Sequence, residues 1–232
     1  MTARSLCGLI LALSMRVSCL GLDVLDQLWP EVDVFVKTSQ DTRLFFMGAG
    51  TRIRQGGYSD GQLGVHFDMY FGAIFKHLAE LRPDATRSRL VSVRLGYLFG
   101  KTPAGSPDPF TEHTPIIEVT PRFYLPKNTL LTDRSRYDFR FVNGVYTPRY
   151  RNRLKIERTF QTGKRAITPY VHAEAFYDRR YGAFHRFRYA AGGEFEINRR
   201  FVLEGYYLHQ QDSQAEPRGL NVAGIGLQIY LH

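Results

Sequence analysis

A two-residue alternation over residues 62–71 constrains the fold of this chain more than any other feature. One parity of the segment is apolar, and the other carries polar or small residues. The apolar set is Leu63, Val65, Phe67, Met69 and Phe71, and the intervening set is Gly64, His66, Asp68 and Tyr70. Successive side chains of a strand point to opposite faces, so one face can meet lipid while the other meets water. The pattern is typical of a transmembrane β-barrel.

Similar segments recur almost to the last residue, separated by turn-forming residues. They cover residues 31–38, 42–51, 62–71, 89–99, 114–125, 130–142, 149–160, 166–178, 184–197, 201–212 and 219–231. This count is eleven, whereas bacterial single-chain barrels have an even number of strands. We therefore expect an all-β, antiparallel transmembrane barrel of twelve strands, with ten as the alternative. The twelfth strand would lie within residues 22–29 or within the 73–88 connector.

The connectors alternate in length. Short ones at residues 126–128, 161–165 and 198–200 are interleaved with longer ones at 101–113, 143–148, 179–183 and 213–218. Short periplasmic turns and longer outer loops are typical of bacterial outer-membrane barrels.

The composition argues against membrane-spanning helices. Only 44% of residues are hydrophobic. Outside the N-terminus, no apolar run approaches the roughly 18 residues that a spanning helix needs. A spanning strand needs only about 9 to 11 alternating residues, so a barrel can cross a bilayer at low mean hydropathy.

The first residues resemble a secretory signal peptide. Arg4 precedes an apolar stretch that ends at Met15, and small residues follow it. We expect a signal peptide at 1–21, a barrel at 22–232 and localisation in the cell outer membrane. A buried first helix is the alternative, and lipidation at Cys19 is disfavoured because Arg16 lies where such a signal needs an aliphatic residue.

Both cysteines, Cys7 and Cys19, lie in this leader, so the barrel would contain no disulfide. The formal charge of the chain is +9. The arginines are spread singly over alternate strand positions instead of forming a patch, so we expect no nucleic-acid partner.

The charged parity of the strands predicts a charged lumen. We expect these lumen-facing residues: Arg94, Glu118, Arg122, Arg136, Asp138, Arg140, Arg151, Arg153, Glu157, Glu174, Arg188, Glu194 and Glu204. A soluble sandwich or lipocalin-like barrel would invert the two faces and bury the apolar one. The alternation alone does not distinguish these two arrangements, but the leader and the strongly charged second face favour the membrane barrel.

Several short motifs resemble a known family. They are Arg94-Leu95-Gly96-Tyr97, Arg149-Tyr150-Arg151-Asn152-Arg153-Leu154 with Glu157-Arg158, Pro169-Tyr170 with Glu174-Ala175-Phe176-Tyr177-Asp178, and Gln211-Asp212. From about residue 30 onward the chain resembles the outer-membrane barrels known as domain of unknown function 2490. The resemblance implies a Gram-negative outer-membrane β-barrel with no established activity. One departure is the C-terminus, Tyr230-Leu231-His232, because barrels of this kind usually end in an aromatic residue.

Three functional interpretations remain. Paired lumen charges would make a structural or binding barrel with a salt-bridged lumen, because unpaired buried charge costs several kcal/mol. The arginine excess could instead line a narrow, porin-like channel that favours anions. A lipid-modifying enzyme is the third, with His209, Asp212 and Ser213, or His172 with Glu174, as weak candidates.

We expect no enzyme activity, no catalytic residue, no cofactor and no metal site, since the seven histidines are dispersed and no ligand-type spacing occurs. The expected partners are the lipid bilayer, lipopolysaccharide and the outer-membrane assembly machinery. The sequence leaves the oligomeric state open.

Overall fold

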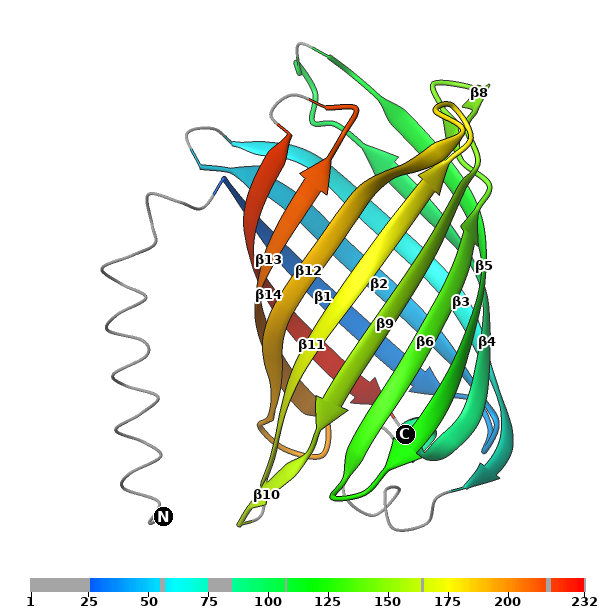
Figure 1. The fold of residues 1–232 in the computed structure, drawn as a ribbon, viewed down its shortest axis with the longest axis vertical. Helices are drawn as coiled ribbons and strands as arrows, with labels where there is room; N and C mark the ends of the chain where they lie inside the picture. The colour runs from blue at the N-terminus through cyan, green and yellow to red at the C-terminus, as the bar shows by residue number, and fades with distance from the viewer. Residues whose placement is uncertain are drawn as a thin grey trace.

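The computed structural model describes residues 26–54, 57–74, 85–106, 108–163, 165–215 and 218–231, and these form a closed β-barrel (Figure 1). The segment predicted to be a signal peptide lies outside the described residues. No helix in the described part of the chain is long and apolar enough to cross a membrane.

Eleven long strands make the barrel wall. They are β1 (Gln27–Lys37), β2 (Thr42–Ile53), β3 (Tyr58–Ile74), β4 (Arg89–Lys101), β5 (Thr111–Leu125), β6 (Thr129–Asp138), β9 (Arg149–Arg158), β11 (Arg165–Asp178), β12 (Ala183–Glu196), β13 (Phe201–Asp212) and β14 (Gly219–Leu231). Short strands β7 (Phe141–Val142), β8 (Val145–Tyr146) and β10 (Phe160–Thr162) extend its ends, and a 3-10 turn, η1, spans Ala85–Ser88. The strands lie close to the ranges that the alternation predicts.

The ring contains two kinds of strand pairing. Sequential strands pair antiparallel, and β4 pairs with β5 to continue the ring, whereas β1 pairs with β14 in parallel. In an up-and-down sheet with an odd number of strands, the first and last run the same way, so parallel pairing is the only way to close it. The expectation of twelve antiparallel strands, or ten, is therefore corrected to a mixed barrel of eleven long strands in the described residues.

The structure adds no strand at either of the two places proposed for a twelfth strand, as far as it describes them. Residues 27–29 belong to the start of β1. In the 73–88 connector, residues 75–84 lie outside the described part, and Ala85–Ser88 form the 3-10 turn. Neither adds a strand to the described ring.

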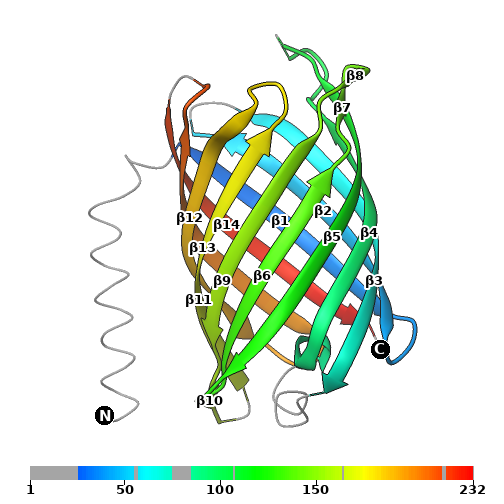
Figure 2. The same cartoon turned by 45° about the vertical axis from the view of Figure 1, so that its right-hand side comes forward.

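Connections between strands lie at both ends of the barrel. The turns at 38–41, 126–128 and 197–200 lie at the lower end in Figure 2, together with the C-terminal end of β14. The described residues of the connections at 102–110, 139–148 and 213–218 lie at the upper end, where β1 begins. Because β1 and β14 are parallel, the start of β1 and the end of β14 lie at opposite ends of the barrel.

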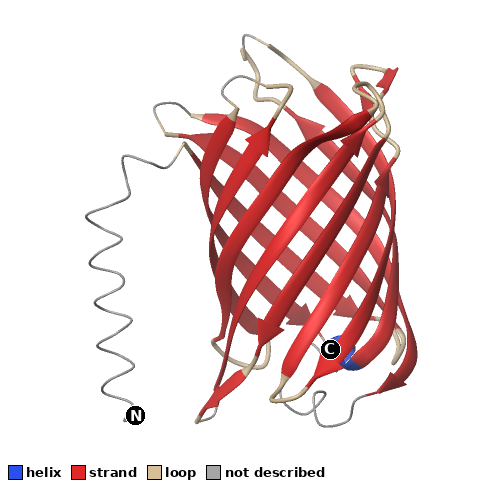
Figure 3. Cartoon of the chain, viewed as in Figure 1, coloured by secondary structure: helices blue, strands red, loops and turns tan. Residues whose placement is uncertain are grey.

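The faces of the wall have opposite polarity. Large apolar side chains are exposed on the outside, among them Leu63 (65%), Val171 (51%) and Leu154 (50%). Charged side chains of the other parity, such as Asp68 and Glu174, are buried. Strands make up the wall between the two ends of the barrel (Figure 3), and the exposed apolar side chains lie on its outer face.

Glycines allow the interior side chains to pack against the wall. His66 on β3 lies directly opposite Gly96 on β4, and a Cβ at Gly96 would lie 2.0 Å from the His66 Nδ1 atom. The His66 ring also stacks on Phe45, with centroids 4.9 Å apart. Only glycine permits this approach of the imidazole to the backbone.

Candidate functional site: the charged lumen

A cavity of about 720 Å³ occupies the barrel interior. Among the described residues that line it are thirteen arginine and lysine residues and ten aspartate and glutamate residues. Twelve of the thirteen residues that the strand parity places in the lumen line this cavity, and Asp138 is fully buried beside it. The lumen is thus charged on all sides, with an excess of cations.

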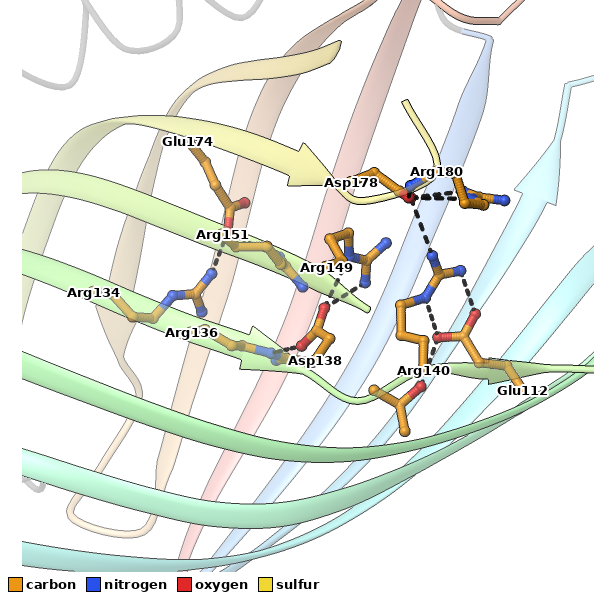
Figure 4. A network of polar contacts seen from close by, with 11 residues as sticks. Glu112, Arg134, Arg136, Asp138, Arg140, Arg149, Arg151, Glu174, Asp178 and Arg180 are labelled. Carbon is orange, nitrogen blue, oxygen red and sulfur yellow. Dashed lines mark hydrogen bonds and ion pairs between the residues drawn. The ribbon is translucent and has the colours of Figure 1, made fainter. Parts of the chain in front are cut away.

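Two carboxylates bridge arginines of neighbouring strands near the upper end (Figure 4). Asp138 accepts hydrogen bonds from Arg136 Nε (2.5 Å) and Arg149 Nη2 (2.7 Å). Glu174 Oε1 accepts from Arg134 Nη2 (2.5 Å) and Arg151 Nε (3.0 Å). Each carboxylate therefore screens two guanidinium groups from each other.

A third bridge closes the upper rim. Arg140, just after β6, donates to Glu112 Oε1 and Oε2 at 2.9 and 2.8 Å, and its Nη1 lies 3.8 Å from Asp178 Oδ2. Asp178 also receives Arg180 Nη2 at 2.7 Å (Figure 4). The hydrogen bonds between Arg180 and Asp178 raise the pKa of Arg180, which lies in the turn after β11. The rim thus connects β5, the β6–β7 connection and β11.

At the lower end, Arg87 of η1 reaches the wall. Its Nη1 lies 2.8 Å from Glu157 Oε1 on β9, and its Nη2 lies 2.7 Å from Glu194 Oε1 on β12. Lys155 Nζ contacts the same two carboxylates at 2.8 and 3.5 Å. This cluster connects the β3–β4 connector to strands that are distant in sequence.

A fourth cluster lies on β2, β3 and β4. Asp68 receives Arg43 Nε at 2.8 Å and Arg94 Nε at 2.6 Å, and Tyr70 donates its hydroxyl to the same carboxylate at 3.0 Å. The two guanidinium groups also lie over aromatic rings, Arg43 over Phe35 at 4.1 Å and Arg94 over Phe45 at 4.4 Å. Ion pairs and cation–π contacts both hold these arginines in place.

The wall around the parallel β1–β14 pair is acidic. Glu31 on β1 and Glu204 on β13 lie in one row, on either side of Gly226. Glu31 and Asp33 hydrogen-bond to each other, and Glu204 accepts hydrogen bonds from the Tyr170 hydroxyl and from Gln228 Nε2. No arginine or lysine of the described chain forms an ion pair with any of these three carboxyl groups.

The residues considered for catalysis are engaged elsewhere. His209 Nδ1 lies 2.9 Å from Asn221 Oδ1, Asp212 Oδ2 accepts from Arg186 Nε at 2.7 Å, and the Ser213 hydroxyl donates to the His185 carbonyl at 3.2 Å. The structure does not assemble these three into a triad. His172 faces the cavity beside Glu174, but that carboxylate is taken by arginines.

The described residues contain no group of three or more histidine, cysteine, aspartate or glutamate side chains placed to hold a metal ion.

Several residues that line the lumen are absent from the predicted set of thirteen. They are Glu31, Asp33, Arg43, Asp68, Arg87, Glu112, Arg134, Arg149, Lys155 and Arg186. Five of them share a strand and a parity with a selected residue, as Arg134 does with Arg136, and Glu31, Asp33, Arg43 and Asp68 lie on strands from which none was selected. Arg87 carries no such signal, because it lies in a connector.

No curated protein matches the sequence. Among solved structures, the β domain of the Bordetella autotransporter BrkA is similar at 13% identity and a TM-score of 0.40, over 82% of each chain. The family model described as protein of unknown function (DUF2490) matches residues 27–221, which includes every long strand except part of β14. The chain therefore belongs to the DUF2490 family.

Proposed function

We propose that this protein is a barrel of the bacterial outer membrane with a structural or binding role. The supporting observation is the polarity of its wall, which exposes Leu63, Val171 and Leu154 outside and keeps the ion pairs inside. Such a large exposed apolar surface is unfavourable in water and favourable in lipid. Short turns face the periplasm in barrels of this kind, so the 38–41, 126–128 and 197–200 turns would lie there.

The ion pairs support a lumen that is braced instead of open. Arg134, Arg140 and Arg151 each contact carboxylates of other strands, so the bridges run across the wall. In a narrow barrel, such bridges reduce the width of the lumen and stiffen the wall.

Conductance of the refolded barrel in a planar bilayer tests this role, with protease resistance measured on the same sample. A folded barrel without discrete current steps is the expected result. Discrete steps with anion preference would contradict the braced lumen.

A narrow channel that favours anions is the second candidate, and the excess of arginine and lysine among the cavity residues favours it. The double variant Arg151→Ala/Arg153→Ala separates the two roles. Removal of side chains that obstruct a pore raises conductance, whereas removal of braces lowers stability. If neither property changes, both roles are wrong.

Partners follow from the proposed location. Phe141, Val145 and Tyr146 are exposed on the β7–β8 extension of the upper end, and Arg179 lies in a neighbouring turn. Aromatic and basic groups at the outer end suit contact with lipopolysaccharide phosphates. The outer-membrane assembly machinery is the partner that insertion of a barrel at this location requires.

A further inference from the structure

The arginine ladder between β6 and β9 contains one guanidinium group that forms no ion pair within the described chain. Arg134 lies directly opposite Arg153, and Arg136 directly opposite Arg151. Three of these four form ion pairs with Glu174 or Asp138, whereas Arg153 has no ion pair and no side-chain hydrogen bond within the described chain. Arg153 lines the cavity, so its guanidinium is available to a ligand there.

The middle of β1 lies across the lumen from Arg153. In one direction, the row of paired residues runs from Arg153 through Glu174, Arg188 and Gln210 to Leu220, beside the start of β1. In the other direction, the adjacent row runs from Asn152 through Ser135, Val119, Val93 and Met69 to Thr42, beside the end of β1. The rows meet β1 at both of its ends, so the residues at its centre, Glu31 and Asp33, lie at the height of Arg153.

Electrostatic interactions connect the two walls across the cavity. Arg153 and Arg134 both attract the charge of Glu31, although neither forms an ion pair with it. Tyr206, which lines the cavity, interacts with Glu31 and Glu204 on one side and with Arg188 and Arg153 on the other. Charges on the two walls thus interact, although no ion pair joins Arg153 or Arg134 to Glu31.

The acidic wall also has an unsatisfied atom. The Asp33 Oδ1 atom is buried and has no hydrogen-bond partner. Arg94 acts on Asp33, but its guanidinium is held by Asp68. A buried polar atom without a partner is costly, and a donor placed in the cavity would relieve that cost.

We infer that this part of the lumen binds a zwitterionic small molecule. Its carboxylate or phosphate lies against Arg153 and Arg134, and its ammonium group lies against Glu31, Asp33 and Glu204. A singly charged molecule satisfies one wall only, whereas a zwitterion satisfies both and adds no net charge. The inference rests on the proposed binding role and names the class of ligand.

A series of ω-amino acids tests this site by calorimetry on the refolded barrel in detergent. The probes are glycine, β-alanine, 4-aminobutyrate and 6-aminohexanoate. Butyrate and butylammonium, each of which carries only one of the two charges, represent the two halves of the zwitterion. Affinity is expected to peak at one chain length and to exceed that of either half by about tenfold, the effect of one charge-assisted hydrogen bond. A series without a peak, or a half that binds as well as the zwitterion, overturns the inference.

Variants locate the binding site. Arg153→Gln and Glu31→Gln are each expected to weaken binding of the preferred amino acid about tenfold, whereas Arg153→Lys retains it. Asp60→Asn is the matched control, since Asp60 lines the cavity but bonds to Thr51 and Ser59. Unchanged affinity in Arg153→Gln overturns the site even if the amino acid binds. Denaturant unfolding of each variant shows whether that variant is folded. Binding is measured in detergent, so the result does not depend on where the barrel lies in the cell.

Discussion

Arg134 on β6 and Arg153 on β9 lie directly opposite each other in the antiparallel ladder. Like charges in this position repel. Glu174 compensates from β11, where it lies opposite Arg153 and receives Arg134 Nη2 at 2.5 Å. One carboxylate therefore connects three neighbouring strands, β6, β9 and β11.

Replacement of that carboxylate is expected to destabilise the barrel strongly. Glu174→Gln leaves Arg134 and Arg151 without their shared counter-ion, and loss of one partner of a buried pair costs about 3 kcal/mol or more. Urea unfolding of the refolded barrel measures the loss. Asp41→Asn is the control, because Asp41 pairs with Arg89 at an exposed site, where a salt bridge contributes less than about 1 kcal/mol. Equal losses in the two variants would contradict the importance of the Glu174 bridge.

The contact between His66 and Gly96 gives a second prediction. Gly96→Ala places a methyl group 2.0 Å from the His66 Nδ1 atom, so the ring must move away from the wall. The expected loss of unfolding free energy is about 1 to 3 kcal/mol, the usual cost of overpacking. Gly205→Ala is the matched control, since a Cβ there meets no atom within 4 Å. If Gly96→Ala is no less stable than Gly205→Ala, the interior packing described here is wrong.

The parallel pairing of β1 with β14 makes a prediction about topology. A peptide tag placed directly before Asp26 and a tag placed after His232 should lie on opposite sides of the membrane. Antibody binding to intact cells should therefore detect one of the two tags and miss the other. A third tag between Ser39 and Gln40 should behave like the C-terminal tag, because the β1–β2 turn lies at the same end. If both terminal tags react alike, the ring has an even number of strands.

The sequence predicts the strands and their faces well, and the physical reason is the period of two. Glu118, Arg151 and Glu174 reach the lumen because each shares a parity with other charged residues of its strand. The number of strands was wrong because the even-number rule took precedence over a count of eleven that matches the structure. Alternation within strands carries no information on how the ring closes.

The partners of the lumen charges could not be predicted in the same way. Parity places Glu31 and Arg153 in the lumen, but the stagger of the strands decides that they face each other. The contact of Arg87 with Glu157 and Glu194 depends on the path of a connector. These relationships depend on register, which one sequence does not specify.

Fluorescence of Trp29 tests the central claim, which is that the charged face is the lumen and the apolar face meets lipid. Trp29 is the only tryptophan in the chain and lines the cavity. The Arg188 guanidinium carbon, Cζ, lies 4.9 Å from the centroid of the Trp29 ring. In vesicles of lipids with brominated acyl chains, Trp29 should keep its fluorescence. A Trp29→Phe/Leu154→Trp variant, with its indole on the outer face, should be strongly quenched. Quenching of Trp29 as strong as in that variant would mean that the faces are reversed, with the charged face toward lipid.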